Sequence, residues 1–152
     1  MPGSPPGTTG ASGINDSGQI VGSYGNPPEF QSFLDTRGVF TPIAVPGALS
    51  TIANGINNRG QIVGVSEDST GSFPAFLDTG GVFTTIDVPG AIFTTPEGIN
   101  DLGQIVGVFE DSTGFFGAFL ATPINPAPEP SGLALVTMGV IGLGLISRRK
   151  RA

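Results

Sequence analysis

A ten-residue motif, GIN-x-x-GQIVG, occurs three times in this chain and constrains its fold more than any other feature. The copies occupy residues 13–22, 55–64 and 98–107, at offsets of 42 and then 43 residues. Shorter segments keep the same register: SFLDTRGVF, AFLDTGGVF and AFLAT begin at 32, 75 and 118, and VPGA occurs at 45–48 and 88–91. A period of this size is typical of stacked arrays such as solenoids and propellers.

The middle copy indicates what one repeat contains. Segments rich in β-branched and aromatic residues alternate with turns of Gly, Asn, Asp and Ser, which predicts four short strands. These strands are expected at residues 51–56, 61–66, 73–78 and 82–88. Because no helical period precedes the C-terminal tail, the body is predicted to be all-β.

Side-chain alternation predicts which residues each sheet buries. In the second strand, Val63 and Val65 are expected on one buried face. In the fourth strand, the expected shared face carries Val82, Thr84, Ile86 and Val88.

Aromatic residues recur in the same register. Core packing is expected for Phe33, Phe76 and Phe119, and also for Phe40 and Phe83. Phe115 and Phe116 replace Ser72 and Phe73 beside a turn, where they form either an exposed patch or, as we prefer, a cap over the last repeat.

A four-stranded unit of this length has the size of a propeller blade. The predicted fold is therefore about three four-stranded, propeller-like blade repeats in an incomplete array, at about 8–50, 51–93 and 94–122 within residues 1–122. Pro42 falls in a fourth strand, where proline is tolerated chiefly at a sheet edge. The glycines that end each first turn, Gly18, Gly60 and Gly103, are expected to have positive φ.

The third copy is expected to lack a fourth strand, so that residues 8–122 contain eleven strands. Three blades are too few to close a ring, and residues 1–13 contain neither a basic start nor an apolar core of a signal peptide. We expect the chain to be a C-terminal fragment, or a mis-started reading frame, of a longer array. Upstream sequence without further copies would contradict this expectation.

The last residues predict a membrane-associated tail. A proline-rich linker at 123–130 ends in Pro128, Glu129 and Pro130, and the 17 residues from 131 to 147 carry no charge. As a helix this segment spans about 25 Å, the short end of what crosses a bilayer. The basic residues after it lie in the tail at 148–152 and are Arg148, Arg149, Lys150 and Arg151. By the positive-inside rule they stay in the cytoplasm and hold the body on the other side of the membrane.

These tail features, in this order, resemble the PEP-CTERM class of bacterial sorting signals. The resemblance implies processing near Pro128 to Pro130 by an exosortase, a transient anchor in the inner membrane, and delivery to the surface of a Gram-negative bacterium, often one that makes exopolysaccharide. The motif GIN-x-x-GQIVG, the AFLD or AFLA segment and Val-Pro-Gly-Ala resemble the HAF family of probable extracellular repeats. In the first copy Ser32 replaces the alanine of AFLD.

Composition excludes several function classes. The chain has a formal net charge of −6, and residues 1–127 alone carry −9, so nucleic acid is not an expected partner. It contains no His and no Cys, which removes the usual general base, the thiol nucleophile and most transition-metal sites. No catalytic residue, no cofactor-binding residue and no metal ligand is therefore predicted, and no cofactor is expected.

Two acidic pairs remain to be weighed. Glu67 with Asp68 and Glu110 with Asp111 lie in equivalent turns, which favours solvated turn residues over a catalytic acid and base. A calcium site at Asp68 or Asp111 is the better functional alternative because these turns supply oxygen ligands.

The preferred function is a non-enzymatic surface or matrix repeat protein, exported and possibly associated with exopolysaccharide. The alternative is a carbohydrate-binding or ligand-binding module of a larger surface protein. The chain has no Trp and only Tyr24, whereas glycan sites often use Trp or Tyr platforms, and this favours the scaffold.

Overall fold

The computed structural model describes residues 8–123, which form three antiparallel sheets and contain no helix and no closed barrel. The first sheet consists of β1 (Thr8–Ile14), β2 (Gln19–Asn26), β3 (Glu29–Thr36) and β4 (Val39–Ile43). The second consists of β5 (Ser50–Ile56), β6 (Gln61–Glu67), β7 (Ala75–Thr79) and β8 (Val82–Ile86). The third consists of β9 (Ala91–Ile99), β10 (Ile105–Asp111) and β11 (Phe116–Ala121). The prediction of an all-β body is confirmed.

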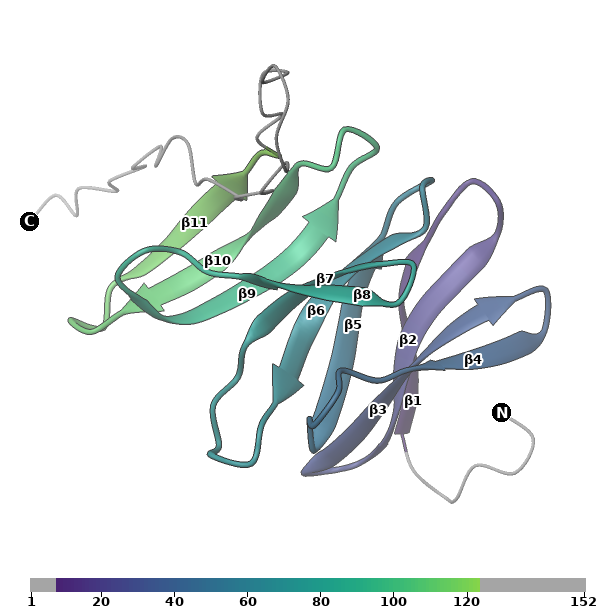
Figure 1. Cartoon of the computed structure of the whole chain (residues 1–152), viewed down its shortest axis with the longest axis horizontal. Coiled ribbons are helices and arrows are strands. Elements are labelled where there is room, and N and C mark those ends of the chain that lie inside the picture. The colour runs from purple at the N-terminus through teal and green to yellow at the C-terminus, as the bar shows by residue number, and fades with distance from the viewer. Residues whose placement is uncertain (1–7, 124–152) are drawn as a thin grey trace, which may run out of the picture.

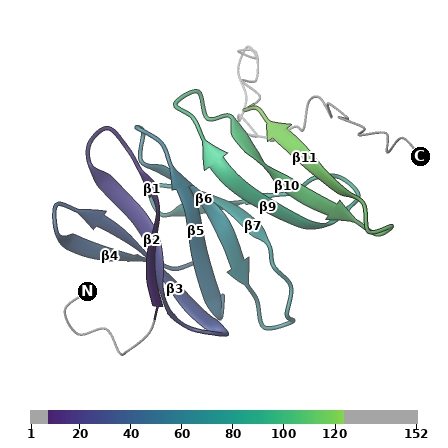
Figure 2. The same ribbon diagram turned by 180° about the vertical axis from the view of Figure 1, so that it is seen from behind.

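Each sheet is a meander in which consecutive strands pair. Figure 1 shows the three sheets side by side in chain order, and the view from behind in Figure 2 shows the same succession. The described residues contain the eleven strands expected from the repeats, with three in the last sheet. The third sheet starts at Ala91, ahead of the repeat boundary expected at 93/94, because β9 pairs with β10 along nearly its full length.

The core lies between the sheets. One cluster joins Val21 and Ile43 of the first sheet to Ile56, Ile62 and Phe76 of the second. A second cluster joins the opposite face of the second sheet to the third; its members include Val63, Ile86, Ile105, Phe109 and Phe119. The middle sheet is therefore buried on both faces, and Ile62 is as buried as Val63 although the two side chains point in opposite directions.

One predicted burial pattern is wrong in part. Ile86 and Val88 are buried, but Val82 is 67% exposed and Thr84 is exposed as well. Val82 opens the edge strand β8 directly after the Gly80–Gly81 turn, where no neighbouring sheet covers it. Val39 opens β4 in the same way and is 66% exposed, so this exposure belongs to the repeat.

The recurring phenylalanines cover glycines on the neighbouring strand. Phe33, Phe76 and Phe119 lie directly opposite Gly22, Gly64 and Gly107 in the registers of the sheets. A Cβ atom on any of these glycines would lie 2.7 to 2.8 Å from the facing ring. The three rings are at most 5% exposed, which confirms their predicted place in the core. Of the second pair of phenylalanines, Phe83 is half-buried whereas Phe40 is exposed, and each ring packs edge-on against the core ring of its own sheet.

Turns and edges follow the sequence closely. Gly18, Gly60 and Gly103 have φ of 73°, 74° and 76°, as predicted, and each amide closes its turn by donating to the asparagine carbonyl at the turn's start. Pro42 lies in β4, which is the edge strand of its sheet, also as predicted.

A bulge recurs in the first strand of each sheet. The registers skip Ser12 in β1, Asn54 in β5 and Glu97 in β9 at the same repeat position, and β9 has a second irregularity at Ile92. A bulge changes the direction in which a side chain points, and here it directs side chains of the first strands toward the neighbouring sheet.

Candidate functional site

The predicted sorting and membrane residues lie outside the described residues. These are Pro128, Glu129 and Pro130, the segment 131–147, and Arg148, Arg149, Lys150 and Arg151. Their roles stay predictions. Among residues 8–123, no helix has the length and apolar character needed to cross a membrane.

In each of the two acidic turns, the aspartate accepts hydrogen bonds from residues of the same turn. One carboxylate oxygen of Asp68 accepts hydrogen bonds from the Thr70 hydroxyl at 2.6 Å, the Thr70 amide at 2.8 Å and the Ser72 amide at 3.1 Å. Asp111 repeats this pattern with Thr113 and Phe115 at the same three distances. In both turns the threonine hydroxyl is the main cause that lowers the pKa of the aspartate, followed by the backbone amides.

This geometry gives Asp68 and Asp111 a structural task in Asx-type turns. The carboxylate of each faces amides and a hydroxyl of its own loop, which is the arrangement expected for a turn residue. Within residues 8–123, no three acidic side chains gather closely enough to hold a metal ion.

The asparagine of each GIN-x-x-GQ motif joins its own turn to the next sheet. The Asn57 side-chain oxygen accepts from the amides of Arg59 at 3.0 Å and Gln61 at 2.9 Å. Its nitrogen donates to the Gln61 side chain at 2.8 Å and to the carbonyl of Asn100 in the third sheet at 2.9 Å. Asn15 makes the same bonds in its turn and donates to the Asn57 carbonyl at 3.1 Å. The motif is therefore both a turn and a connection between sheets.

The residue after each of these asparagines extends the connection at the surface. The Asn58 side-chain nitrogen donates to carboxylate oxygens of Asp16 at 2.7 Å and Asp101 at 2.8 Å. In return, the Asp16 amide donates to the Asn58 side chain, and the Asn58 amide donates to Asp101. The alternation Asp–Asn–Asp places a donor between two acceptors. The hydrogen bond from the Asn58 backbone amide lowers the pKa of Asp101 most, followed by the bond from the Asn58 side chain.

The bulged residues form a third connection. Ser12 donates its hydroxyl to the Ala53 carbonyl, and Asn54 donates to the Pro96 carbonyl at 2.8 Å. None of the three kinds of intersheet bond is predicted by the sequence patterns above. One signal in the sequence could have indicated them. A polar residue occurs at the same repeat position in every copy, and donors in one copy stand opposite acceptors in the next.

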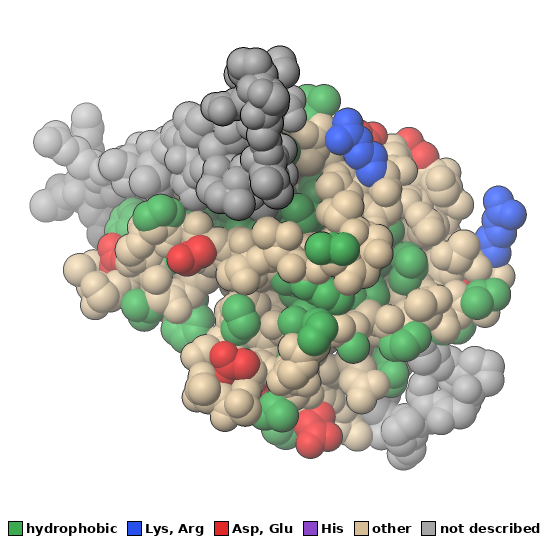
Figure 3. Space-filling model, in the orientation of Figure 1, with side chains coloured by type: hydrophobic (Ala, Val, Ile, Leu, Met, Phe, Trp, Pro, Cys, Tyr) green, Lys and Arg blue, Asp and Glu red, His purple; other side chains and the backbone are tan. Residues whose placement is uncertain are grey.

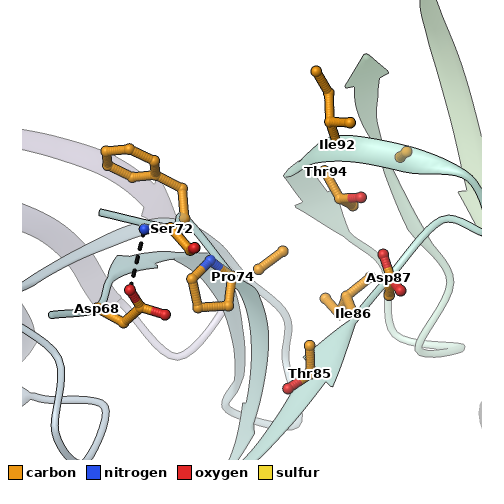
Figure 4. A pocket seen from close by; sticks show the side chains of 11 residues that line it. Asp68, Ser72, Pro74, Thr85, Ile86, Asp87, Ile92 and Thr94 are labelled. Atoms are coloured by element: carbon orange, nitrogen blue, oxygen red, sulfur yellow. Dashed lines mark hydrogen bonds between the residues drawn. The ribbon is translucent and has the colours of Figure 1, made fainter. Parts of the chain in front are cut away.

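An open pocket of about 220 Å³ lies between the second and third sheets. One wall is the β6–β7 loop, with Asp68, Ser72 and Pro74. The other is formed by Asp87 of the β8–β9 connection and Ile92 of β9. Figure 4 shows these side chains on the two sides of the pocket, with the Ser72 amide directed at Asp68. The β6–β7 loop is longer than the Pro27–Pro28 turn at the same place in the first sheet.

Apolar side chains border the pocket. Phe73 lines it and packs against Phe93, with ring centroids 6.3 Å apart, and both rings are 45% exposed. Aromatic faces beside carboxylates and hydroxyls can accept a small polar ligand such as a sugar. Among the described residues, this pocket is a candidate site for a ligand.

The third copy carries the same loop, and no facing wall lies opposite it among residues 8–123. Phe115 packs against Phe109 at a centroid distance of 6.3 Å, whereas Phe116 is 69% exposed. Phe115 is itself 45% exposed, so both rings form an exposed patch, and the cap interpretation holds only for the contact of Phe115 with Phe109.

Comparisons with known proteins leave the chain unassigned. No protein-family model, no curated protein and no solved structure matches it.

Proposed function

We propose that the protein is a non-catalytic repeat scaffold of the bacterial cell surface or extracellular matrix, sorted by its C-terminal segment. The observation that carries the structural part is the use of the repeated polar residues. Their side chains form hydrogen bonds within turns and between sheets, as Asn15, Asn57, Asp68 and Asp111 show. Residues conserved in register within the chain thus support the array itself.

We further infer that each sheet is one propeller-like blade. The first strand β5 lies against β1 on one side and β9 on the other, as the innermost strands of successive blades do. Acidic side chains are spread over the face shown in Figure 3 and do not gather in one patch there. A regular body with dispersed negative charge suits a soluble spacer at a surface.

The sorting part of the proposal rests on the tail sequence and its resemblance to PEP-CTERM signals. Expression of the full chain in a host with an exosortase should give a surface product shorter than the precursor by the segment after the motif. Glu129→Ala should leave the full-length precursor in the inner membrane, while Pro126→Ala, in the same linker, should be processed normally. Equal processing of both variants, read by mass spectrometry, would exclude the motif.

Membrane orientation has a separate test because the chain contains no cysteine. A membrane-impermeant maleimide should label Ser69→Cys in cells with a permeabilised outer membrane. It should label Ala152→Cys only after the inner membrane is lysed. Labelling of both positions before lysis would contradict the proposed topology.

The pocket beside Phe73 and Phe93 favours a second candidate, a carbohydrate-binding or ligand-binding module. Binding of the full chain to a glycan array should then be saturable and weakened by Phe73→Ala. Phe116→Ala is the matched control, because Phe116 occupies the same repeat position without the facing wall. Saturable binding that only Phe73→Ala weakens would establish this candidate over the scaffold alone.

A further inference from the structure

Each sheet has two different apolar faces. We call the side that carries Val21, Val63 or Val106 the Val face. The opposite side carries a cross-strand isoleucine pair and is called the Ile face; the pairs are Ile14 with Ile20, Ile56 with Ile62, and Ile99 with Ile105. Because side chains alternate along a strand, the two names describe opposite sides of one sheet.

The chain uses one interface twice. The Val face of the first sheet packs on the Ile face of the second, and the Val face of the second packs on the Ile face of the third. Val21 and Val63 are each 0% exposed as a result. The repeat therefore encodes a self-complementary, directional contact between successive sheets.

One Val face and one Ile face have no neighbouring sheet within residues 8–123. Val106 is 51% exposed on the Val face of the third sheet, and Val108 and Leu120 are exposed with it. Ile14 is 66% exposed on the Ile face of the first sheet, whereas its equivalent Ile56 is 7% exposed. Contiguous apolar side chains at a protein surface mark interaction sites.

The backbone at the open Val face also has room for another strand. A Cβ atom on Gly13 would lie 3.2 Å from the Cα of Gly55, and one on Gly55 would lie 3.4 Å from the Cα of Gly98. At Gly98 the nearest described atom would be the Val106 side chain of its own sheet, at 3.6 Å. In the part of the chain that the structure describes, no further first strand makes this close approach to β9.

The polar connection is unfinished at the same place. Asn57 donates to Gln61 and to the Asn100 carbonyl, whereas Asn100 donates, among the described residues, to its own Gln104 alone. Within residues 8–123, the second amide hydrogen of Asn100 has no acceptor, and it can donate to a carbonyl on a following sheet. The carbonyl that occupies the equivalent place for Asn57 belongs to a GIN motif.

We propose that the open Val face of the third sheet packs on the open Ile face of the first sheet of a second copy of this chain. The occupant follows from continuity with the two interfaces inside the chain, which join the same two faces in the same order. The contact is head-to-tail, so it generates a ring or a filament depending on the rotation per copy. This inference does not depend on export or on the proposed sorting of the tail.

Two positions in the new contact are mismatched. Glu97 stands where Ser12 and Asn54 donate hydrogen bonds, and it would face the carbonyl of Ala11. Asp101 would meet Asp16, whereas inside the chain each aspartate meets the donor Asn58. Like charges and paired acceptors oppose contact, so association between copies is weaker than the contacts within one chain.

Site-specific cross-linking tests the direction of the contact. The chain lacks cysteine, so chains carrying only Asp16→Cys and chains carrying only Asp101→Cys can be mixed and treated with a short bismaleimide. The proposal expects cross-linked dimers in the mixture and few in either variant alone. Equal cross-linking within a single variant, or none in the mixture, would overturn the head-to-tail contact. The doubly substituted chain Asp16→Cys with Asn58→Cys is the positive control, because these two residues are hydrogen-bonded within the chain.

Substitutions on the open face test its chemistry. Sedimentation of the full chain in mild detergent should show a mass that rises with concentration. Val106→Glu should weaken association by about tenfold or more, because it buries an unpaired charge in the contact. Val82→Glu, at another exposed valine away from both end faces, should leave it unchanged.

Replacing the mismatched carboxylates should strengthen association and gives a second test. Glu97→Asn together with Asp101→Asn restores the donors found in the earlier copies and should strengthen association by about tenfold. If the wild-type chain and this double variant both stay monomeric, the proposal is wrong. Association that Val106→Glu leaves unchanged would place the contact elsewhere, for example in the apolar segment 131–147, and would also overturn it.

Discussion

At the scale of single residues, Asn57 carries two tasks with one amide. Its side chain is buried, and it bonds two backbone amides of its own turn, the Gln61 side chain and a carbonyl of the next sheet. Asn100 has the same turn bonds but no following sheet among the described residues. Comparing Asn57 with Asn100 therefore separates the stability that comes from the turn bonds from the stability that comes from the bond between sheets.

Asn57→Ala is expected to destabilise the chain by about 1 to 3 kcal/mol more than Asn100→Ala. The extra cost comes from the lost bond to the Asn100 carbonyl and from burying unsatisfied groups. Urea unfolding at low protein concentration measures both variants. Equal losses would show that only the turn bonds matter.

The aspartate turns make stability depend on pH. The hydroxyl of Thr70, with two backbone amides, lowers the pKa of Asp68 below its ordinary value of 3.8. A lowered pKa in the folded state contributes stability above pH 3.8 that is lost as pH falls through the folded value. Asp111 contributes in the same way.

Asp68→Asn with Asp111→Asn should therefore flatten the fall in urea midpoint between about pH 4 and pH 2. The variant loses charge-assisted acceptors, so its midpoint at neutral pH should also be lower. Ser69→Ala, an exposed change in the same turn, should keep the wild-type profile. An unchanged slope in the double variant would assign acid sensitivity to other carboxylates.

At the scale of strands, a glycine opposite a phenylalanine sets how closely the first two strands approach. The space beside Gly64 is filled by the Ile52 carbonyl and by the Phe76 ring, whose Cζ would lie 2.8 Å from an added Cβ. Backbone and a buried ring give way less readily than an exposed side chain. The conservation of this pair in all three copies of the chain follows from that geometry.

Gly64→Ala is expected to cost at least about 1 to 3 kcal/mol by overpacking. Gly10→Ala is the matched control in β1, since nothing lies within 4 Å of its added Cβ, and it should stay within about 0.5 kcal/mol of wild type. Thermal unfolding of both variants checks this. Equal stability of the two would mean that the Phe76 ring moves aside without cost.

At the scale of the whole molecule, stability depends on how many sheets flank a residue. Val63 and Val106 occupy the same repeat position, yet the first is 0% exposed between two sheets and the second is 51% exposed at the open face. Val63→Ala should cost about 2 kcal/mol, and Val106→Ala less than about 1 kcal/mol in the monomer. Urea unfolding at low concentration measures the difference. Similar costs would indicate that Val106 is covered.

Much of the strand pattern could be predicted from the sequence because it is local. The turn glycines, the strand positions and the edge location of Pro42 follow from backbone rules that act over a few residues. Val82 was assigned to a buried face because alternation cannot tell a covered part of an edge strand from an uncovered one. The pocket was missed because its walls are two separate segments, the β6–β7 loop and the β8–β9 connection, which only tertiary packing brings together.

The sequence by itself determined the repeat, the all-β meander of each copy and the acidic character of the body, since these depend on spacing and composition. Only the tertiary structure decided which faces meet and which stay open. Val21, Val63 and Val106 share the same motif and differ only in whether another sheet lies beyond them. The exposure of a side chain depends on whether a neighbouring sheet covers it as well as on the residue type, and packing between repeats decides which sheet that is.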